Sequence, residues 1–211
     1  MTLSDNIRVL VVDDHPVVRT GLTTMLHSEP GLEPIGEAKT GVEAIAQFRT
    51  LRPDVTLMDL RMPELTGVEA ITAILKDCPE ARIIILTTYD GDEDIYRGLQ
   101  TGAKGYLLKD ADRSELLAAM RAVHAGQKYI PVLVGAKLVD RMIRPQLSDR
   151  ENDVLKLLAK GKKTQAISLT LGITEGTVKF HITNILQKLG VSDRTQAVVT
   201  AFQRGIANLN L

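Results

Sequence analysis

The sequence is poor in cysteine and in aromatic residues, and both shortages limit what the protein can be. It contains one cysteine, no tryptophan and 3% aromatic residues. The lone Cys78 excludes an internal disulfide and is typical of a protein in a reducing cytoplasm. Because aromatic residues are so few, the hydrophobic cores must be built from aliphatic side chains.

Long hydrophobic runs are also missing. No apolar stretch approaches the ~18–20 residues that a membrane-spanning helix needs. The first residues, 1–6, carry neither the basic start nor the apolar run of a signal peptide. We therefore expect a cytoplasmic protein that does not interact with the membrane.

The formal net charge is zero, but the charges are divided unequally along the 211 residues. Residues 1–130 hold 20 acidic and 14 basic side chains, whereas residues 131–211 hold 6 acidic and 12 basic ones. A chain of this length forms one or two domains. An acidic first part and a basic second part predict different partners, with a polyanion plausible for the second.

The first part alternates short apolar runs with segments of helical periodicity. The runs predict buried strands at 7–12, 32–38, 55–58, 83–86 and 105–108. Each is followed by a helical pattern, including a weaker helix that the acidic run Asp90-Gly91-Asp92-Glu93-Asp94 opens and that ends near Thr101. This alternation predicts an α/β fold, a doubly wound five-stranded parallel (βα)5 sheet with helices on both faces.

Polar side chains follow four of these strands directly. They are Asp13, Asp14, Asp59, Thr87 and Lys109. Because the carboxyl ends of parallel strands share one edge of the sheet, we expect these side chains to meet there. Three neighbouring carboxylates repel one another unless a cation lies among them, and oxygen ligands favour Mg²⁺. Thr87 and Lys109 would then donate to a phosphoryl group. The alternative is that each residue has a loop or capping role, as when Asp59 caps the next helix.

The five residues resemble the response-regulator receiver domain in type, order and position, over about residues 6–126. The resemblance implies that Asp59 accepts a phosphoryl group from the phosphohistidine of a sensor histidine kinase. It also implies a Mg²⁺ site made by Asp13, Asp14, Asp59 and the Arg61 backbone carbonyl, phosphoryl contacts from Thr87 and Lys109, and a switching role for Tyr106. One departure is Asp110, where receiver domains often carry the proline that favours a cis bond. We interpret His15 as a residue satisfied at a helix start rather than as a ligand.

The pattern of the second part predicts a small all-α domain. A linker that we expect to contain a helix precedes it. Ser148 and Glu151 form a capping box, and the segment Gly172-Ile173-Thr174 separates two short helices in a helix-turn-helix pattern. The second of these helices would enter the major groove of double-stranded DNA. Its outward positions include Lys179, Phe180, Thr183, Asn184, Gln187 and Lys188. The alternative is an ordinary solvated polar face, but the basic balance and residues 160–163 favour DNA.

Motifs in this part resemble the LuxR-type DNA-binding domain over about residues 145–208. They are Leu147-Ser148-x-Arg150-Glu151, the segment from Gly172 to His181, and Lys188-Leu189-Gly190-Val191-Ser192-x-Arg194-Thr195. The resemblance implies that Glu151 pairs with Arg194 to hold the fold and that Lys179, Phe180 and Thr183 face bases. Thr164, Ala166 and Gly176 depart from the usual pattern, and a glycine inside a helix costs up to about 1 kcal/mol.

The whole chain therefore resembles a two-component response regulator of the NarL/FixJ type. We predict a receiver domain at 1–126, a linker at 127–145 and a DNA-binding domain at 146–211. We expect a transcription regulator that is switched by phosphorylation of Asp59 and binds paired DNA half-sites as a homodimer.

Two other functions remain open from the sequence. A Mg²⁺-dependent aspartyl phosphatase shares the phosphoaspartate chemistry, but such enzymes place a second acid two residues after the nucleophile, where this chain has Arg61. We expect no enzyme activity beyond slow self-dephosphorylation. In the other alternative, a partner protein and not phosphorylation controls the chain, and the complete acidic pocket argues against it.

Overall fold

The structure is a computed structural model that describes residues 6–88, 91–143, 145–203 and 206. The chain divides into two compact units. The first comprises Met1–Asp90 and Ile95–Ala136, and the second comprises Gly91–Asp94 and Lys137–Leu211. Each unit has its own hydrophobic core, so each is described by itself.

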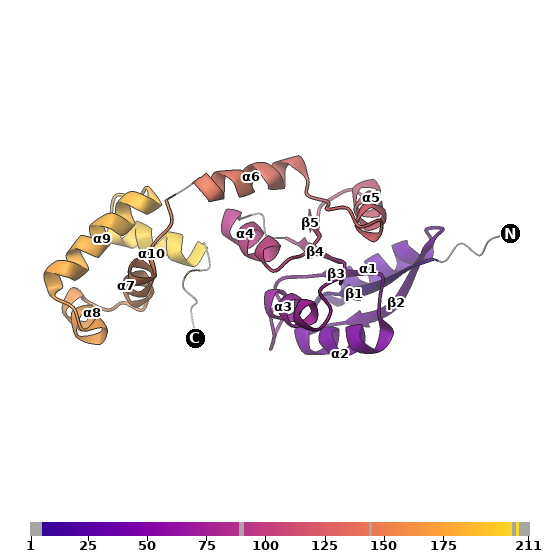
Figure 1. Cartoon of the computed structure of the whole chain (residues 1–211), viewed down its shortest axis with the longest axis horizontal. Coiled ribbons are helices and arrows are strands. Elements are labelled where there is room, and N and C mark those ends of the chain that lie inside the picture. Colours follow the sequence, from indigo (N-terminus) through magenta and orange to yellow (C-terminus); the bar gives the residue numbers. More distant parts are fainter. Residues whose placement is uncertain (1–5, 89–90, 144, 204–205, 207–211) are drawn as a thin grey trace. The chain divides into compact units, whose positions relative to one another are not determined.

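The first unit is built on one parallel sheet of five strands (Figure 1). The strands are β1 (Ile7–Val12), β2 (Leu32–Ala38), β3 (Val55–Met58), β4 (Ile83–Thr87) and β5 (Gly105–Leu108). Their spatial order is β2-β1-β3-β4-β5, so the chain reverses its direction of travel across the sheet between β1 and β3. The predicted doubly wound sheet is confirmed. Ligands bind at the carboxyl ends of strands beside such a reversal.

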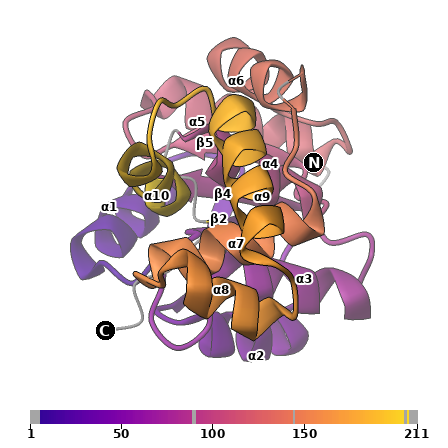
Figure 2. The same cartoon turned by 90° about the vertical axis from the view of Figure 1, so that its left-hand side faces the viewer.

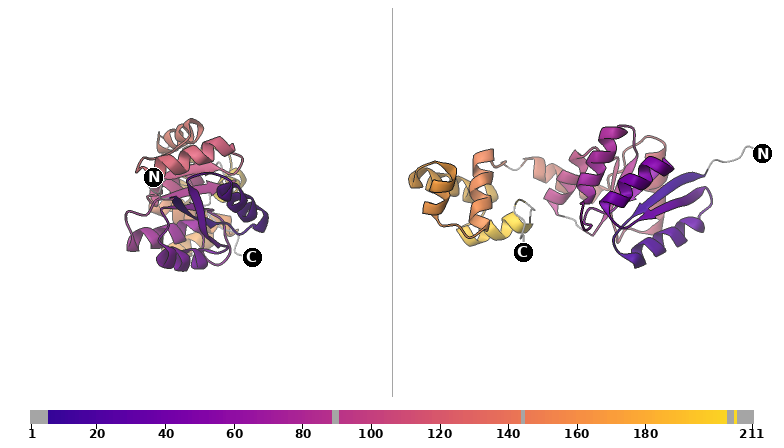
Figure 3. Two further views of the ribbon diagram at one scale, coloured as in Figure 1. Left: turned by 90° about the vertical axis from the view of Figure 1, so that its right-hand side faces the viewer. Right: turned by 90° about the horizontal axis from the view of Figure 1, so that it is seen from below.

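Helices cover both faces of this sheet (Figures 1 and 3). The helices α1 (Pro16–His27) and α5 (Arg113–His124) lie on one face, and α2 (Gly41–Leu51), α3 (Gly67–Asp77) and α4 (Asp92–Gln100) lie on the other. Side chains alternate along each strand, so each strand contributes to both layers. Asp90, the first residue of the acidic run expected to open α4, lies outside the described residues, and α4 begins at Asp92 within that run.

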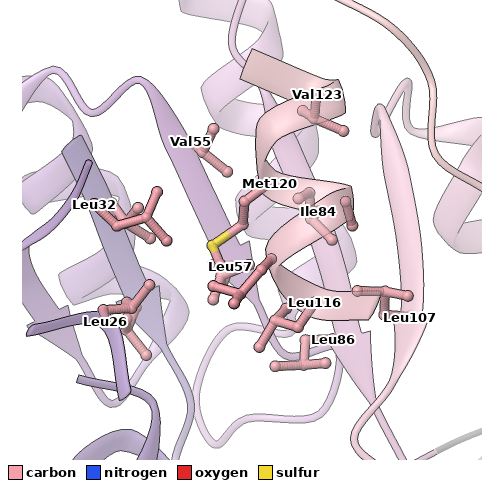
Figure 4. Packing of buried hydrophobic residues seen from close by; sticks show 14 residues of the cluster. Leu26, Leu32, Val55, Leu57, Ile84, Leu86, Leu107, Leu116, Met120 and Val123 are labelled. Carbon is pink, nitrogen blue, oxygen red and sulfur yellow. The ribbon is translucent and has the colours of Figure 1, made fainter. Parts of the chain in front are cut away.

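The core between the sheet and the α1/α5 face is aliphatic, as the composition requires. Leu57 and Ile84 from the strands pack against Met120 and Val123 of α5, with Leu26 of α1 beside them (Figure 4). All five are at most 1% exposed. Burial of this kind stabilises a fold by about 25 cal/mol for each Å² of apolar surface.

The second unit is helical and contains α7 (Asp149–Ala159), α8 (Thr164–Leu171), α9 (Glu175–Leu189) and α10 (Arg194–Gln203). Ser148 and Glu151 form the predicted capping box at α7. Gly172 ends α8 in a left-handed conformation with φ 65°, and Thr174 caps α9. Helices α8 and α9 thus form the predicted helix-turn-helix, seen face-on in Figure 2. Val154, Ile167 and Ile185 form the centre of its core.

A further helix, α6 (Val132–Ile143), occupies most of the expected linker. The division between the units falls inside it, after Ala136. Within the second unit, Arg141 of α6 donates from Nε to Glu93 Oε2 at 2.6 Å. The proposed boundaries at 126 and 146 stay predictions. Among the described helices, none combines the length and the apolar character required to cross a membrane.

Candidate functional site

The carboxylate of Asp59 is fixed at the carboxyl end of β3. The backbone N–H of Asp59 donates to the Val12 carbonyl at 2.9 Å, which extends the pairing of β3 with β1 by one residue. The side chain is almost fully buried, with Asp59 only 4% exposed. Its Oδ1 accepts from the Leu60 N–H at 2.7 Å. The carboxylate is therefore held by the backbone that follows it and does not cap α3, which Thr66 does.

Lys109 joins Asp59 to the acidic pair that ends β1. Its Nζ lies 2.6 Å from Asp13 Oδ2 and 2.8 Å from Asp59 Oδ2. The Lys109 backbone N–H donates to the Thr87 carbonyl at 2.9 Å, which places the lysine beside the end of β4. Three strands thus deliver Asp13, Asp59 and Lys109 to one point, as the sequence predicts.

The electrostatics of this cluster are set by burial. Burial raises the pKa of Asp59 from its ordinary value, the nearby Asp13 carboxylate raises it further, and the Lys109 ammonium only partly opposes this. Burial alone would lower the pKa of Lys109, but its hydrogen bonds to Asp13 and Asp59 outweigh burial and raise it. The lysine therefore stays charged between the two carboxylates.

The residues at this rim fit a divalent cation. Asp13, Asp14, His15 and Asp59 each offer a ligand atom, and these atoms all lie within 4.8 Å of one another. Oδ1 of Asp14 is a buried oxygen that lies 2.6 Å from His15 Nδ1. Carboxylate oxygens are the ligands that Mg²⁺ prefers.

Thr87 and Tyr106 lie on neighbouring strands behind the rim, and both are fully buried at 0% exposed. A Cβ added at Gly98 of α4 would lie 3.3 Å from Tyr106 Cε2, so the ring packs closely under α4. Tyr106 is therefore buried and not a tyrosine with its hydroxyl at the surface. The switching role of Tyr106 and the part of the Arg61 carbonyl stay predictions. No described peptide bond is cis, which includes the bond after Lys109.

The exposed face of α9 carries several of the residues predicted to contact DNA. Lys179 and Thr183 are exposed, and Phe180 is 63% exposed, which is unusual for a phenylalanine. The Thr183 hydroxyl donates to the Lys179 carbonyl at 3.1 Å, and Asn184 is half-buried. The inward side chains Val178, Ile182 and Ile185 fix which side of the helix faces out.

The structure changes the assignment of two basic residues in this unit. The buried Glu151 carboxylate pairs with Lys188, whose Nζ lies 2.7 Å from Oε2. The expected pair of Glu151 with Arg194 is wrong, because the Arg194 guanidinium instead donates to Thr164 Oγ1 at 3.2 Å. Lys188 is thus held inside its own domain, although it was predicted to contact DNA. Sequence reasoning missed this pair because 37 residues separate its members.

The fold and the rim together define a receiver domain joined to a helix-turn-helix domain. Family comparisons agree with the geometry: the response regulator receiver domain matches residues 9–121. The family described as bacterial regulatory proteins, luxR family, matches residues 145–201. The chain therefore belongs to the response regulators that carry a receiver domain and a LuxR-type DNA-binding domain.

Curated relatives match over nearly the whole chain. The response regulator protein VraR of Staphylococcus epidermidis is 40% identical over 205 residues, which cover 95% of this chain and 98% of that protein. VraR of Staphylococcus aureus is 41% identical with the same coverage.

Solved structures also resemble the chain. Salmonella typhimurium RcsB has a TM-score of 0.78 at 26% identity and covers 93% of this chain and 100% of that chain. The response regulator ChrA of a heme-sensing two-component system has a TM-score of 0.58 at 37% identity, with 96% and 99% covered.

Proposed function

We propose that this protein is a transcription regulator switched by Mg²⁺-dependent phosphorylation of Asp59 by a sensor histidine kinase. The observation that carries the proposal is the arrangement of the rim. Asp59 is buried, and Lys109 bridges it to Asp13, with the Asp14 carboxylate close by. A rim of this kind, in the same chain as a LuxR-type domain, supports a phosphoryl signal that ends in DNA binding.

The reaction needs an attacking carboxylate oxygen of Asp59 and a way to neutralise the negative charge of the phosphoryl group. A carboxylate oxygen of Asp59 forms the new bond to phosphorus while the bond between phosphorus and the kinase histidine breaks, and that bond's electron pair returns to the ring nitrogen. Asp13, Asp14, Asp59 and the Arg61 carbonyl would hold Mg²⁺, which supplies positive charge against the phosphoryl oxygens. Lys109 and Thr87 would donate to those oxygens.

The change at Asp59 must reach the second domain through the elements beside it. A phosphoryl group adds about −1.5 to −2 charge at neutral pH. Thr87 would move toward it, and the buried Tyr106 ring lies behind Thr87 and under α4. Phosphorylation would shift the equilibrium between two arrangements of Thr87 and Tyr106. The α4 surface would thus differ between the two states.

The DNA complex is proposed to contain two copies of the chain. One solved structure shows RcsB dimers bound to DNA, at 27% identity and a TM-score of 0.74. Another shows RcsB bound to promoter DNA in the presence of a phosphomimetic, at 26% identity and a TM-score of 0.75. By analogy, α9 of each copy would enter the major groove of one half-site. Lys179, Phe180 and Thr183 would make the contacts.

We propose no enzyme activity for the chain beyond slow self-dephosphorylation. A second acid two residues after Asp59 would support a phosphatase, and Arg61 stands there. The lone Cys78, which is free, supports action in the reducing cytoplasm, where the kinase domain and DNA are both accessible.

The test is phosphorylation of the full-length protein by a small phosphodonor with Mg²⁺, followed on a phosphate-affinity gel. We expect a slower band that disappears on acid or base treatment, since acyl phosphates hydrolyse readily. Asp59→Asn removes the nucleophile and should abolish the band. Asp110→Asn changes an exposed acid beside the same rim and is the matched control, which should keep it. A band of equal strength in Asp59→Asn would refute the proposal.

A further inference from the structure

We propose that Phe180 selects thymine in each DNA half-site by contact with the C5 methyl group of the base. The proposal rests on the proposed function, in which α9 enters the major groove, and it goes further because it names the chemical group that one residue recognises. The ligand is therefore a duplex with a 5-methylpyrimidine at one position of the half-site, which is thymine or 5-methylcytosine.

Phe180 lies at the centre of the outward face of α9. It stands two residues after the buried Val178 and two residues before the buried Ile182, and two residues are about half a turn of helix. Its side chain therefore points directly away from the core of the domain. Lys179 and Thr183 lie together on one flank of this centre, where the Thr183 hydroxyl donates to the Lys179 carbonyl at 3.1 Å. When this face enters the major groove, Phe180 lies against the base edges.

The ring of Phe180 is open to a ligand on its outward side. The chain has three phenylalanines, and the other two are buried or half-buried, whereas Phe180 is 63% exposed. Side chains of a helix lean towards its N-terminus, and Gly176, one turn before Phe180, has no side chain to cover the ring. A Cβ on Gly176 would meet nothing nearer than Thr174 Oγ1 at 3.6 Å, so this space is open. The neighbouring His181 ring contacts Phe180 edge-on, with the centroids 5.9 Å apart, and supports the ring from one side.

The chemistry of the side chain sets which base it selects. A phenylalanine ring has no hydrogen-bonding group, so it discriminates between bases by apolar contact alone. Among the four bases, thymine presents a methyl group in the major groove, whereas the others present polar donors and acceptors there. A ring pressed against those polar atoms would remove their water without replacing its hydrogen bonds. Burial of one methyl group against the ring should raise affinity about fourfold.

Replacement of thymine by deoxyuridine, which lacks only the methyl group, tests this directly. The probe is the duplex that the full-length protein, with phosphodonor and Mg²⁺, enriches most from a random-sequence DNA library. Each thymine is then replaced singly, and we expect affinity to fall about fourfold at one thymine of each half-site. Phe180→Ala should bind the thymine and deoxyuridine duplexes equally. Val199→Ala, which shortens another exposed apolar side chain, on α10, is the matched control and should keep the fourfold difference.

A second comparison and the possible outcomes separate this proposal from the proposed function. At the same position, the unmodified protein should bind 5-methylcytosine about fourfold more tightly than cytosine, and Phe180→Ala should bind both equally. Sequence-specific binding that no deoxyuridine weakens would overturn the methyl contact and keep the DNA-binding function. A fourfold loss that persists in Phe180→Ala would overturn the role of Phe180. Failure to enrich any sequence would contradict the proposed function itself, and with it this proposal. The deoxyuridine series on the unmodified protein does not depend on whether a variant folds normally.

Discussion

Lys109 is the residue that keeps two buried carboxylates compatible with a folded protein. It contacts Asp13 and Asp59 at 2.6 and 2.8 Å while each carboxylate remains almost wholly buried. Because burial and Asp13 raise the pKa of Asp59, its charge is held at a cost in folding free energy. A buried carboxylate held at such a cost is more typical of a functional site than of a group that stabilises the fold.

Replacement of Asp59 by asparagine should therefore stabilise the protein when no divalent cation is present. The amide keeps the shape of the side chain and removes one of two neighbouring negative charges. We expect the free energy of unfolding to rise by about 1 kcal/mol in thermal or urea unfolding with a chelator. Asp110→Asn, at an exposed acid, should have no such effect. A clear loss of stability in Asp59→Asn would show that its charge supports the fold.

Lys179 and Lys188 lie on the same helix but should respond oppositely to removal. Lys179→Ala should weaken DNA binding and lower its salt dependence, with little change in stability, because the side chain is exposed. Lys188→Ala should lower stability by about 1–3 kcal/mol, because it leaves the buried Glu151 carboxylate without its partner. DNA titrations of both variants measure the loss of DNA affinity, and urea unfolding measures the loss of stability. Equal losses of stability would contradict the assignment.

At the scale of elements, a helix start can be predicted from neighbouring residues, but the partner of a distant charge cannot. Ser148 and Glu151 form a capping box at α7 as the sequence predicts, because a cap depends on residues only two or three positions away. The partner of Glu151 depends on how α7 packs against α9, so sequence motifs led to the wrong residue, Arg194. Local chemistry was predictable, and long-range pairing was not.

Two glycines at helix starts should respond oppositely to alanine. A Cβ on Gly67 would lie 2.0 Å from the Asp59 carbonyl oxygen, so Gly67→Ala must push α3 away from the rim and should cost about 1–3 kcal/mol. A Cβ on Gly176 would meet nothing nearer than Thr174 Oγ1 at 3.6 Å. Gly176→Ala should therefore stabilise α9 by up to about 1 kcal/mol. Thermal unfolding measures both, and destabilisation by Gly176→Ala would refute the second part.

The ion pair between α7 and α9 predicts how stability depends on pH. Burial alone would raise the pKa of Glu151, but Lys188 and the hydrogen bonds from Ser148 outweigh it and lower the pKa below 4.5. The ionised Glu151 carboxylate therefore contributes fully to the free energy of unfolding above about pH 4.5, and this contribution is lost as the pH falls through the lowered pKa. Glu151→Gln keeps a capping residue and should be less stable by about 1–2 kcal/mol near pH 7. The difference from the unmodified protein should shrink below pH 4.5, and a difference independent of pH would contradict this account.

At the scale of the whole molecule, the sequence shows two domains more clearly than the point where they join. The apolar runs of the sheet and the opposite charges of the two parts identify the domains, since both features repeat over many residues. The helix α6 was expected, but the division of the units after Ala136 depends on packing that no local pattern encodes. The rim was predictable because parallel strands bring their carboxyl ends together. His15 lies at the start of α1, as the sequence predicts.

The central claim is that a phosphoryl group on Asp59 controls DNA binding by the second domain. The most direct measurement is sequencing of the genomic DNA fragments retained by the full-length protein, with and without phosphodonor and Mg²⁺. We predict that phosphodonor increases retention of fragments with paired half-sites about one helical turn apart, and that Asp59→Asn abolishes the increase while Asp110→Asn keeps it. Equal retention of the same fragments in all conditions and in Asp59→Asn would contradict the claim.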